Sequence, residues 1–338
     1  RIGKFLMFRV YVVALTAICL SIPSNSEAAP AFNIITVAGT GKAGFSGDGG
    51  PATQAQISGP SCVAFDSVGR LYFVDARNNR VRRVGTDGVI ETVLGTGEKG
   101  FQRETLPATQ TNLVEPYGLH VDRHDNLYVF SRGHSKLFKV GPDGIAQVIA
   151  GTGRQGFSGD GGPATEAQLS WANHMLMNAA GEFIIADTGN QRVRKIDTNG
   201  IITTIAGTGE AGFGGDGRPA IHAMFNGLSA MAFDAEENLY LADFENHRIR
   251  KISRDGTITT IAGTGEPTYN GDGIPALQAN IGEPCGVLVD SAGIVYIGDQ
   301  VNRRVRAVTK DGVMHTVAGI GKVGMQGDGG PAIEARIF

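Results

Sequence analysis

The segment Ile202–Gly209 reads ITTIAGTG, and the 338-residue chain contains six versions of it. They are IITVAGTG (34–41), IETVLGTG (90–97), AQVIAGTG (146–153), ITTIAGTG (202–209 and again 258–265) and MHTVAGIG (314–321). Each version starts 56 residues after the previous one, with no insertion or deletion. A repeat of this length indicates one supersecondary unit stacked on copies of itself.

The residues between two versions predict short antiparallel strands. In the first unit the strands are expected near 60–66, 70–75, 80–84 and 89–94, where polar and apolar residues alternate between Gly, Asn and Asp turns. Four hairpin-linked strands per unit are typical of a β-propeller blade. We therefore expect an all-β propeller over residues 33–338. Its complete blades are expected at about 60–95, 116–151, 172–207, 228–263 and 284–319.

The sequence holds six outer strands but only five sets of the other three strands. We expect Asn33–Ala38 to be the outer strand of a sixth blade whose remaining strands follow Phe338 in a longer protein. A closed ring leaves no exposed strand edge, and such a ring commonly joins strands from both termini in one blade. The full-length propeller is thus expected to have six blades and to be a monomer.

A connector joins each outer strand to the next unit, as in GFSGDGGPATEAQL (156–169). Its proline is expected to open one helical turn, and the Gly-Asp-Gly before it to supply positive-φ positions and a capping carboxylate. Calcium binding is the alternative, but calcium usually takes several carboxylates from one loop, and each loop offers one. We predict no metal site. The acidic positions are Asp48, Glu104, Asp160, Asp216, Asp272 and Asp328.

Residues 1–28 are predicted to be a secretory signal peptide. Arg1, Lys4 and Arg9 form a basic start, and the apolar run Val10–Ile22 precedes small residues. A retained anchor is the alternative, but a run of 13 residues is short for a membrane span. We expect a periplasmic or secreted protein with no membrane span after cleavage. The net charge of −3 and the lack of a basic stripe predict no nucleic-acid partner.

No catalytic constellation is visible in the sequence. The seven histidines occupy different positions of the repeat without metal-ligand spacing, and there is no nucleophile elbow. The Gly-Thr-Gly segments lack the lysine and the helix of a phosphate loop. We predict no catalytic residue and no cofactor. Cys62 and Cys285 lie on separate units and are expected to be free thiols.

Four units carry Asp-x-x-Asn-x-Arg after their second strand. Asp and Asn side chains form hydrogen bonds within such turns, and the arginine is expected to clamp the nearby carboxylate and join the blades. The second unit instead has Ser131, His134 and Lys136. The repeated structural positions are Asp75, Asn78, Arg80, Asp187, Asn190, Arg192, Asp243, Asn246, Arg248, Asp299, Asn302 and Arg304.

Positions at which one unit differs from the others are better candidates for a ligand site than positions that all units share. This holds where those positions lie on one face of the propeller. The turn after the second strand and the connector are expected on one face of the propeller. Trp171, the only tryptophan, and His174 stand where other units have mostly small or acidic residues; simple packing is the alternative. The candidate ligand-binding residues are Arg77, Arg132, His134, Trp171, His174, Phe244, Glu245 and Gln300.

Three segments carry a resemblance to a known family. Pro284–Asp290 (PCGVLVD), Leu239–Asp243 (LYLAD) and Asn246–Ile252 (NHRIRKI) resemble the NHL repeat. With the AGTG…GFSGDGGPAT connector, the chain is similar to exported bacterial NHL-repeat proteins and to the NHL region of teneurins over about residues 33–338. The resemblance implies a six-bladed propeller that acts mostly as a binding platform.

We therefore expect a binding or scaffold module for a protein, peptide or glycan ligand. One alternative is a channel-centred lyase or lactonase, because related propellers of those types use metal-bound histidines or carboxylates around the channel. No such set can be assigned to positions of this sequence, so we lean away from an enzyme. The other alternative is an extracytoplasmic sensor domain of a larger signalling protein.

Overall fold

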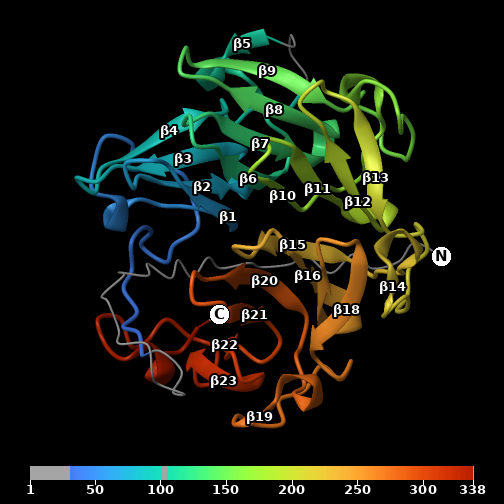
Figure 1. Ribbon diagram of the computed structural model, residues 1–338. Coiled ribbons are helices and arrows are strands. Elements are labelled where there is room, and N and C mark those ends of the chain that lie inside the picture. The colour runs from blue at the N-terminus through green and yellow to red at the C-terminus, as the bar shows by residue number, and fades with distance from the viewer. Residues whose placement is uncertain (1–30, 101–104, 338) are drawn as a thin grey trace, which may run out of the picture.

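The computed structural model describes residues 31–100 and 105–337, and these residues form a β-propeller. Five antiparallel blades follow one another in chain order, each built on four strands. Figure 1 shows them passing from β1–β4 at the left, over the top, to β20–β23 at the bottom. The predicted all-β class and the five four-stranded blades are confirmed. The predicted signal peptide, residues 1–28, lies outside the described residues.

The strands have the following bounds. Blade one holds β1 (Pro60–Phe65), β2 (Leu71–Asp75), β3 (Arg80–Val84) and β4 (Ile90–Leu94). Blade two holds β6 (Pro116–Val121), β7 (Leu127–Ser131), β8 (Lys136–Val140) and β9 (Ile145–Ala150). Blade three holds β10 (His174–Met177), β11 (Phe183–Asp187), β12 (Arg192–Ile196) and β13 (Ile202–Ala206). Blade four holds β15 (Leu228–Phe233), β16 (Leu239–Asp243), β17 (Arg248–Ile252) and β18 (Thr257–Ala262). Blade five holds β20 (Pro284–Val289), β21 (Val295–Asp299), β22 (Arg304–Val308) and β23 (Val313–Ala318).

The first strand of each blade is its inner strand. Inner strands of successive blades contact one another, from β1 and β6 through β10 and β15 to β20, and so surround a central channel. The start of an inner strand pairs with the end of the second strand, as Pro60 does with Asp75. We call this end of the blades the turn face: it carries residues 58–62, residues 75–80 and their equivalents in the other blades.

Each connector crosses the outer edge of the blade that it enters. Pro51 pairs with Val89 of the outer edge, and in three blades the same pairing forms a short fifth strand. These strands are β5 (Thr105–Pro107), β14 (Arg218–Pro219) and β19 (Ile274–Pro275). Pro51 is extended, with φ −60° and ψ 127°, so the helical turn begins at Ala52 and not at the proline.

The helical segments are all single 3-10 turns. They are η1 (Ala52–Gln54), η2 (Ala76–Asn78), η3 (Ala108–Gln110), η4 (Arg132–His134), η5 (Ala164–Glu166), η6 (Thr188–Asn190), η7 (Ala220–His222), η8 (Phe244–Asn246), η9 (Ala276–Gln278) and η10 (Ala332–Glu334). In the part of the chain that the structure describes, no helix has the length and apolar character needed to cross a membrane.

The hydrophobic core is divided among the blade junctions. Each of the four junctions between successive blades has one cluster to which both neighbours contribute; between blades one and two, Val74 and Val81 join Leu119 and Val129. The clusters between the other successive blades draw on most of the same positions of the repeat. Two smaller clusters remain, one on blade five and one on blade one. The cluster on blade five packs against Phe32 and Ile34, and the cluster on blade one packs against Val37 and Ala38.

Candidate ligand-binding site at the turn face

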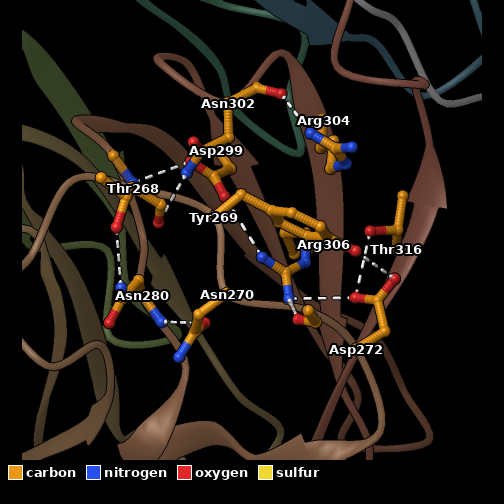
Figure 2. Close-up of polar contacts among 12 residues, drawn as sticks. Thr268, Tyr269, Asn270, Asp272, Asn280, Asp299, Asn302, Arg304, Arg306 and Thr316 are labelled. Carbon is orange, nitrogen blue, oxygen red and sulfur yellow. Dashed lines mark hydrogen bonds and ion pairs between the residues drawn. The ribbon is translucent and has the colours of Figure 1, made fainter.

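A buried ionic network holds each of four connectors to its blade, and Figure 2 shows it in blade five. The side chain of Arg306 is fully buried, with Nη1 3.4 Å from Asp299 Oδ2 and Nη2 3.0 Å from Asp272 Oδ1. Thr316 Oγ1 donates to Asp272 Oδ1 at 3.1 Å. The equivalent arginines are Arg82, Arg194 and Arg250. Connector and blade are therefore joined through one guanidinium.

Two expectations for this region need correction. The connector carboxylates were expected to cap the helical turn, but no side chain caps η1, and Asp48 instead binds Arg82 and Thr92. The arginine of the Asp-x-x-Asn-x-Arg motif was expected to clamp the aspartate. In the structure Arg80 donates to the carbonyl oxygens of Asn78 and Thr96 and stacks on Phe45 at 3.8 Å.

The motif aspartates receive several hydrogen bonds. Asp187 accepts from the Ser170 N–H at 2.7 Å and from Asn190 Nδ2 at 2.8 Å, and Arg194 approaches to 3.3 Å. Burial raises the pKa of Asp187 to about 6, while these donors act in the opposite direction. Asp243 has the same surroundings, and burial likewise raises its pKa to about 6. The repeated positions thus form part of the internal structure of the four blades that carry them.

Blade two has uncharged residues in place of the aspartate and the buried arginine of this network. Ser131 takes the place of the aspartate: its hydroxyl accepts from the Val114 N–H at 3.0 Å and donates to the Val114 carbonyl at 2.8 Å. His134 Nδ1 lies 3.2 Å from the same hydroxyl. Phe138, which is 2% exposed, occupies the position of the buried arginine. Replacing a buried ion pair by apolar residues of similar volume is often neutral for stability.

A cationic and aromatic cluster lies where blades two and three meet on the turn face. We call it the Arg132 cluster; it consists of Arg132, Tyr117, Trp171 and Asn173. The guanidinium carbon of Arg132 is 3.3 Å from the centre of the Tyr117 ring and 5.6 Å from that of Trp171. Arg132 Nη2 donates to Asn173 Oδ1, and Asn173 Nδ2 donates to the Leu228 carbonyl at 3.2 Å. Three side chains from two blades thus surround the positive charge of Arg132.

One polar atom of the cluster is left without a hydrogen bond. Arg132 Nε is buried and has no partner among the described residues. An unsatisfied buried donor costs free energy, so such a group in a native structure needs an explanation, for example an absent water, ion or ligand. The guanidinium stays charged, although burial lowers the pKa of Arg132. The buried arginines Arg82, Arg194 and Arg306 have the same unpartnered Nε, so the distinctive property of this cluster is its positive charge beside Trp171.

Trp171 presents its indole under backbone strain. Its φ is 50°, in the left-handed region that bulky residues avoid, and the residue is 37% exposed. The equivalent positions have positive φ as well, and two of them are Gly59 and Gly227. The fold imposes this conformation on every blade, and only blade three places a large aromatic side chain there. Strained residues cluster at functional sites.

Two titratable side chains beside the cluster, those of His174 and Cys62, have shifted pKa values. Burial lowers the pKa of His174, which follows Asn173, to about 4, and the nearby His120 acts in the same direction. Cys62 Sγ lies 3.8 Å from the Asn173 carbonyl oxygen, and burial raises the pKa of its thiol to about 11. Thiolate formation is therefore suppressed at neutral pH. Both Cys62 and Cys285 are free.

Comparisons with known proteins agree with this architecture. The sequence profile of the Teneurin NHL domain matches residues 20–105. Teneurin-4 of Mus musculus is 29% identical over 279 residues, which are 73% of this chain and 10% of that protein. Teneurin-m of Drosophila melanogaster is 29% identical over 259 residues, or 68% of this chain and 9% of that protein. The chain belongs to the NHL-repeat β-propellers. It spans about a tenth of the length of these relatives.

Solved structures share the NHL-repeat propeller's fold at lower identity. A gluconolactonase from Xanthomonas campestris aligns with a TM-score of 0.54 at 16% identity and covers 77% of this chain and 76% of its own. A virginiamycin B lyase from Staphylococcus aureus aligns with a TM-score of 0.50 at 12% identity, over 79% of this chain and 74% of its own. Identities this low establish the fold alone.

The candidate residues of this NHL-repeat propeller fall into separate places. Arg132, Trp171 and His174 come from the junction of blades two and three, whereas His134 is buried within blade two. Phe244 is 8% exposed and opens η8. The others lie on the corresponding turns of blades one, four and five, namely Arg77, Glu245 and Gln300. Within residues 31–100 and 105–337, no three His, Cys, Asp or Glu side chains are grouped to hold a metal ion.

Two members of the Arg132 cluster were not among the sequence candidates. Tyr117 and Asn173 share one position of the repeat, where Ser61, Ser229 and Cys285 are small. The same comparison between units that singled out Trp171 could have found Tyr117. Asn173 gives a weaker signal, because an asparagine among serines is unremarkable until its contact with Arg132 is known.

Proposed function

We propose that this NHL-repeat propeller is an exported binding module whose ligand contacts the Arg132 cluster. The ligand class is a peptide, protein or glycan that brings a carboxylate to Arg132 and a flat or apolar face to Trp171. The observation that carries the proposal is the positive charge of Arg132, held 5.6 Å from the ring of Trp171, whose indole is exposed. Arginine pairs well with carboxylates, and tryptophan supplies contact area with a polar edge.

The cluster has the composition of a binding hot spot. Trp, Tyr and Arg are enriched among residues that dominate binding energy. Here all three come together at one junction, while the equivalents of Arg132 in the other blades are Ala76, Thr188, Phe244 and Gln300. A ligand bound by this cluster would therefore contact the junction of blades two and three and not every blade equally.

We propose binding in preference to catalysis. The lactonase and lyase propellers resemble this chain in fold at 16% and 12% identity, which supports no assignment of their reactions here. The cysteine beside the cluster has a raised pKa, which does not suit a nucleophile. Recovery of the bound ligand and its mass spectrum distinguish the two functions: a binding module returns its ligand unchanged, and an enzyme returns a product.

The test uses the other blades as a source of conservative variants. Wild-type chain is applied to a glycan array and to a displayed peptide library, beside R132A, which copies Ala76, and W171G, which copies Gly59. L277Q, at a residue 58% exposed on the η9 connector, is the control. Ligands retained by wild type and L277Q, and lost by about tenfold or more in the other variants, support the proposal. Ligands that bind all four proteins equally would overturn it.

A further inference from the structure

One hydrogen bond recurs on the turn face at three junctions between successive blades. The residue just before an inner strand donates its N–H to a side chain of the preceding blade, at the position just before that blade's third strand. The bonds are Glu115 N–H to Asn79 Oδ1 at 3.2 Å, Gly227 N–H to Gln191 Oε1 at 2.9 Å, and Glu283 N–H to His247 Nδ1 at 3.1 Å. The same bond therefore links blade one to two, three to four, and four to five.

Of these three acceptors, His247 is the one that titrates near neutral pH. The amides of Asn79 and Gln191 present a carbonyl oxygen at any pH, whereas a neutral imidazole has one acceptor nitrogen and an imidazolium has none. A backbone N–H can only donate, so Nδ1 of His247 carries no proton when it accepts from Glu283. Protonation of Nδ1 sets two N–H groups against each other and breaks the link.

Charged side chains from several elements lie around His247. Glu245 comes from η8, Arg248 from β17, and Glu266 from the connector that leaves blade four. Burial lowers the pKa of His247 below its ordinary value of 6.5; Glu245 and Glu266 oppose this shift, and Arg248 adds to it. Burial and Glu245 raise the pKa of the Glu283 carboxyl. The neutral imidazole is therefore favoured in the folded protein, and an imidazolium has carboxylates beside it.

We propose that His247 makes the junction of blades four and five a pH-responsive latch. At neutral pH the imidazole accepts the Glu283 N–H and holds the entry to β20 against blade four. Acid converts it to an imidazolium, which releases that N–H and pairs with a neighbouring carboxylate. The sheets stay in contact (Figure 1), because the hydrophobic cluster between them includes Ala242 and Ile297 but not His247. Acid therefore loosens the turn face locally without separating the blades.

Acidification weakens the latch because the unfolded chain binds more protons at His247 than the folded protein does. The latch contributes fully to stability above pH 6.5, and this contribution is lost as the pH falls through the lowered pKa of His247. Asp243, at the start of the same turn, has a pKa raised by burial to about 6. Its equivalent Asp187 has the same raised pKa and begins the turn that leads to Gln191. The bond from Gly227 to Gln191 is thus a matched reference for titration of the aspartate.

Amide hydrogen exchange in the 338-residue chain tests the latch at single amides, with protection factors measured at pH 7.5 and pH 5. We expect the protection factor of the Glu283 amide to fall by about threefold or more on acidification. Those of the reference amides, Glu115 and Gly227, should stay within about twofold. The NMR titration of the His247 ring should have the same midpoint as the Glu283 amide. None of these readouts involves ligand binding at the Arg132 cluster, so the latch and the proposed function can fail separately.

Variants that copy the other junctions test the chemistry of the acceptor. H247Q and H247N copy Gln191 and Asn79 and keep an acceptor that does not titrate. In both, the Glu283 amide should have the same protection factor at the two pH values. E266Q removes a carboxylate that favours the imidazolium, so it should move the wild-type transition to lower pH. A fall for Glu283 that persists in H247Q and H247N would overturn the proposal. So would an equal fall at the two reference amides, or an unchanged Glu283 amide while His247 titrates.

Discussion

The guanidinium of Arg132 stacks on the ring of Tyr117, its central carbon 3.3 Å from the ring centre. Tyr117 lies on β6 and Arg132 begins the turn η4, both in blade two, and Asn173 of blade three completes the contact. The positive charge is thereby fixed beside Trp171, the only tryptophan of the chain. The fluorescence of this residue therefore reports directly on the candidate site.

Iodide should quench Trp171 more effectively when Arg132 is present. A fixed positive charge raises the local concentration of an anion, and the indole is 37% exposed. We expect the iodide Stern–Volmer constant to fall about twofold in R132A at low salt, while quenching by neutral acrylamide stays the same. R77A, on the turn of blade one, is the control and should behave as wild type. An equal fall for both quenchers would show that Trp171 had become buried.

Removing the side chain of Trp171 should cost little stability. The φ of 50° strains a bulky residue by about 1–2 kcal/mol, and glycine avoids that strain at an entropic cost of about 0.5–1 kcal/mol. We expect W171G to change the free energy of unfolding by less than about 1 kcal/mol, against about 3–5 kcal/mol for a tryptophan truncated in a core. Urea denaturation followed by circular dichroism measures this. If W171G instead lowers the free energy of unfolding by about 3–5 kcal/mol, Trp171 is a packing residue.

His174 should make the fold sensitive to acid. Burial lowers its pKa to about 4 in the folded protein from an ordinary value of 6.5, so between these values the unfolded chain binds more protons. Its contribution to stability is complete above pH 6.5 and is lost as the pH falls towards 4. In H174A, which copies Ala230, the urea midpoint should therefore decline less between pH 7 and pH 5. The raised pKa values of Asp187 and Asp243 act in the opposite direction, but they are common to both proteins.

The repeat made the blades predictable, because strand alternation and turn residues are local properties that recur every 56 residues. The buried arginine was not predictable in the same way. Arg80 and Arg82 lie on one strand two residues apart and have the same parity, so alternation places both on one face. Which of them is buried depends on Asp48, in a connector more than 30 residues earlier. The sequence motif therefore pointed to Arg80, whereas the structure pairs Arg82 with both carboxylates.

The candidate site was predicted only in part, because it depends on contacts between blades. Trp171 stood out because one unit differs from its neighbours at that position. Arg132 and Asn173 are 41 residues apart and belong to different blades. Their contact depends on how two neighbouring blades pack, and no spacing within one unit encodes it.

Blade two offers a test of what the buried aspartate–arginine pair of the other blades contributes. Ser131 and Phe138 occupy the positions of Asp75 and Arg82, and both are buried. S131D alone places an unpaired carboxylate in the core and should lower the free energy of unfolding by about 3 kcal/mol or more. F138R alone buries an unpaired guanidinium and should also be strongly destabilising. In the double variant the two charges can meet, so its loss should be smaller than the sum of the single losses by about 1–3 kcal/mol. Urea denaturation of the four proteins completes the cycle. Additive losses would mean that blade two cannot bring these two positions together as the other blades do.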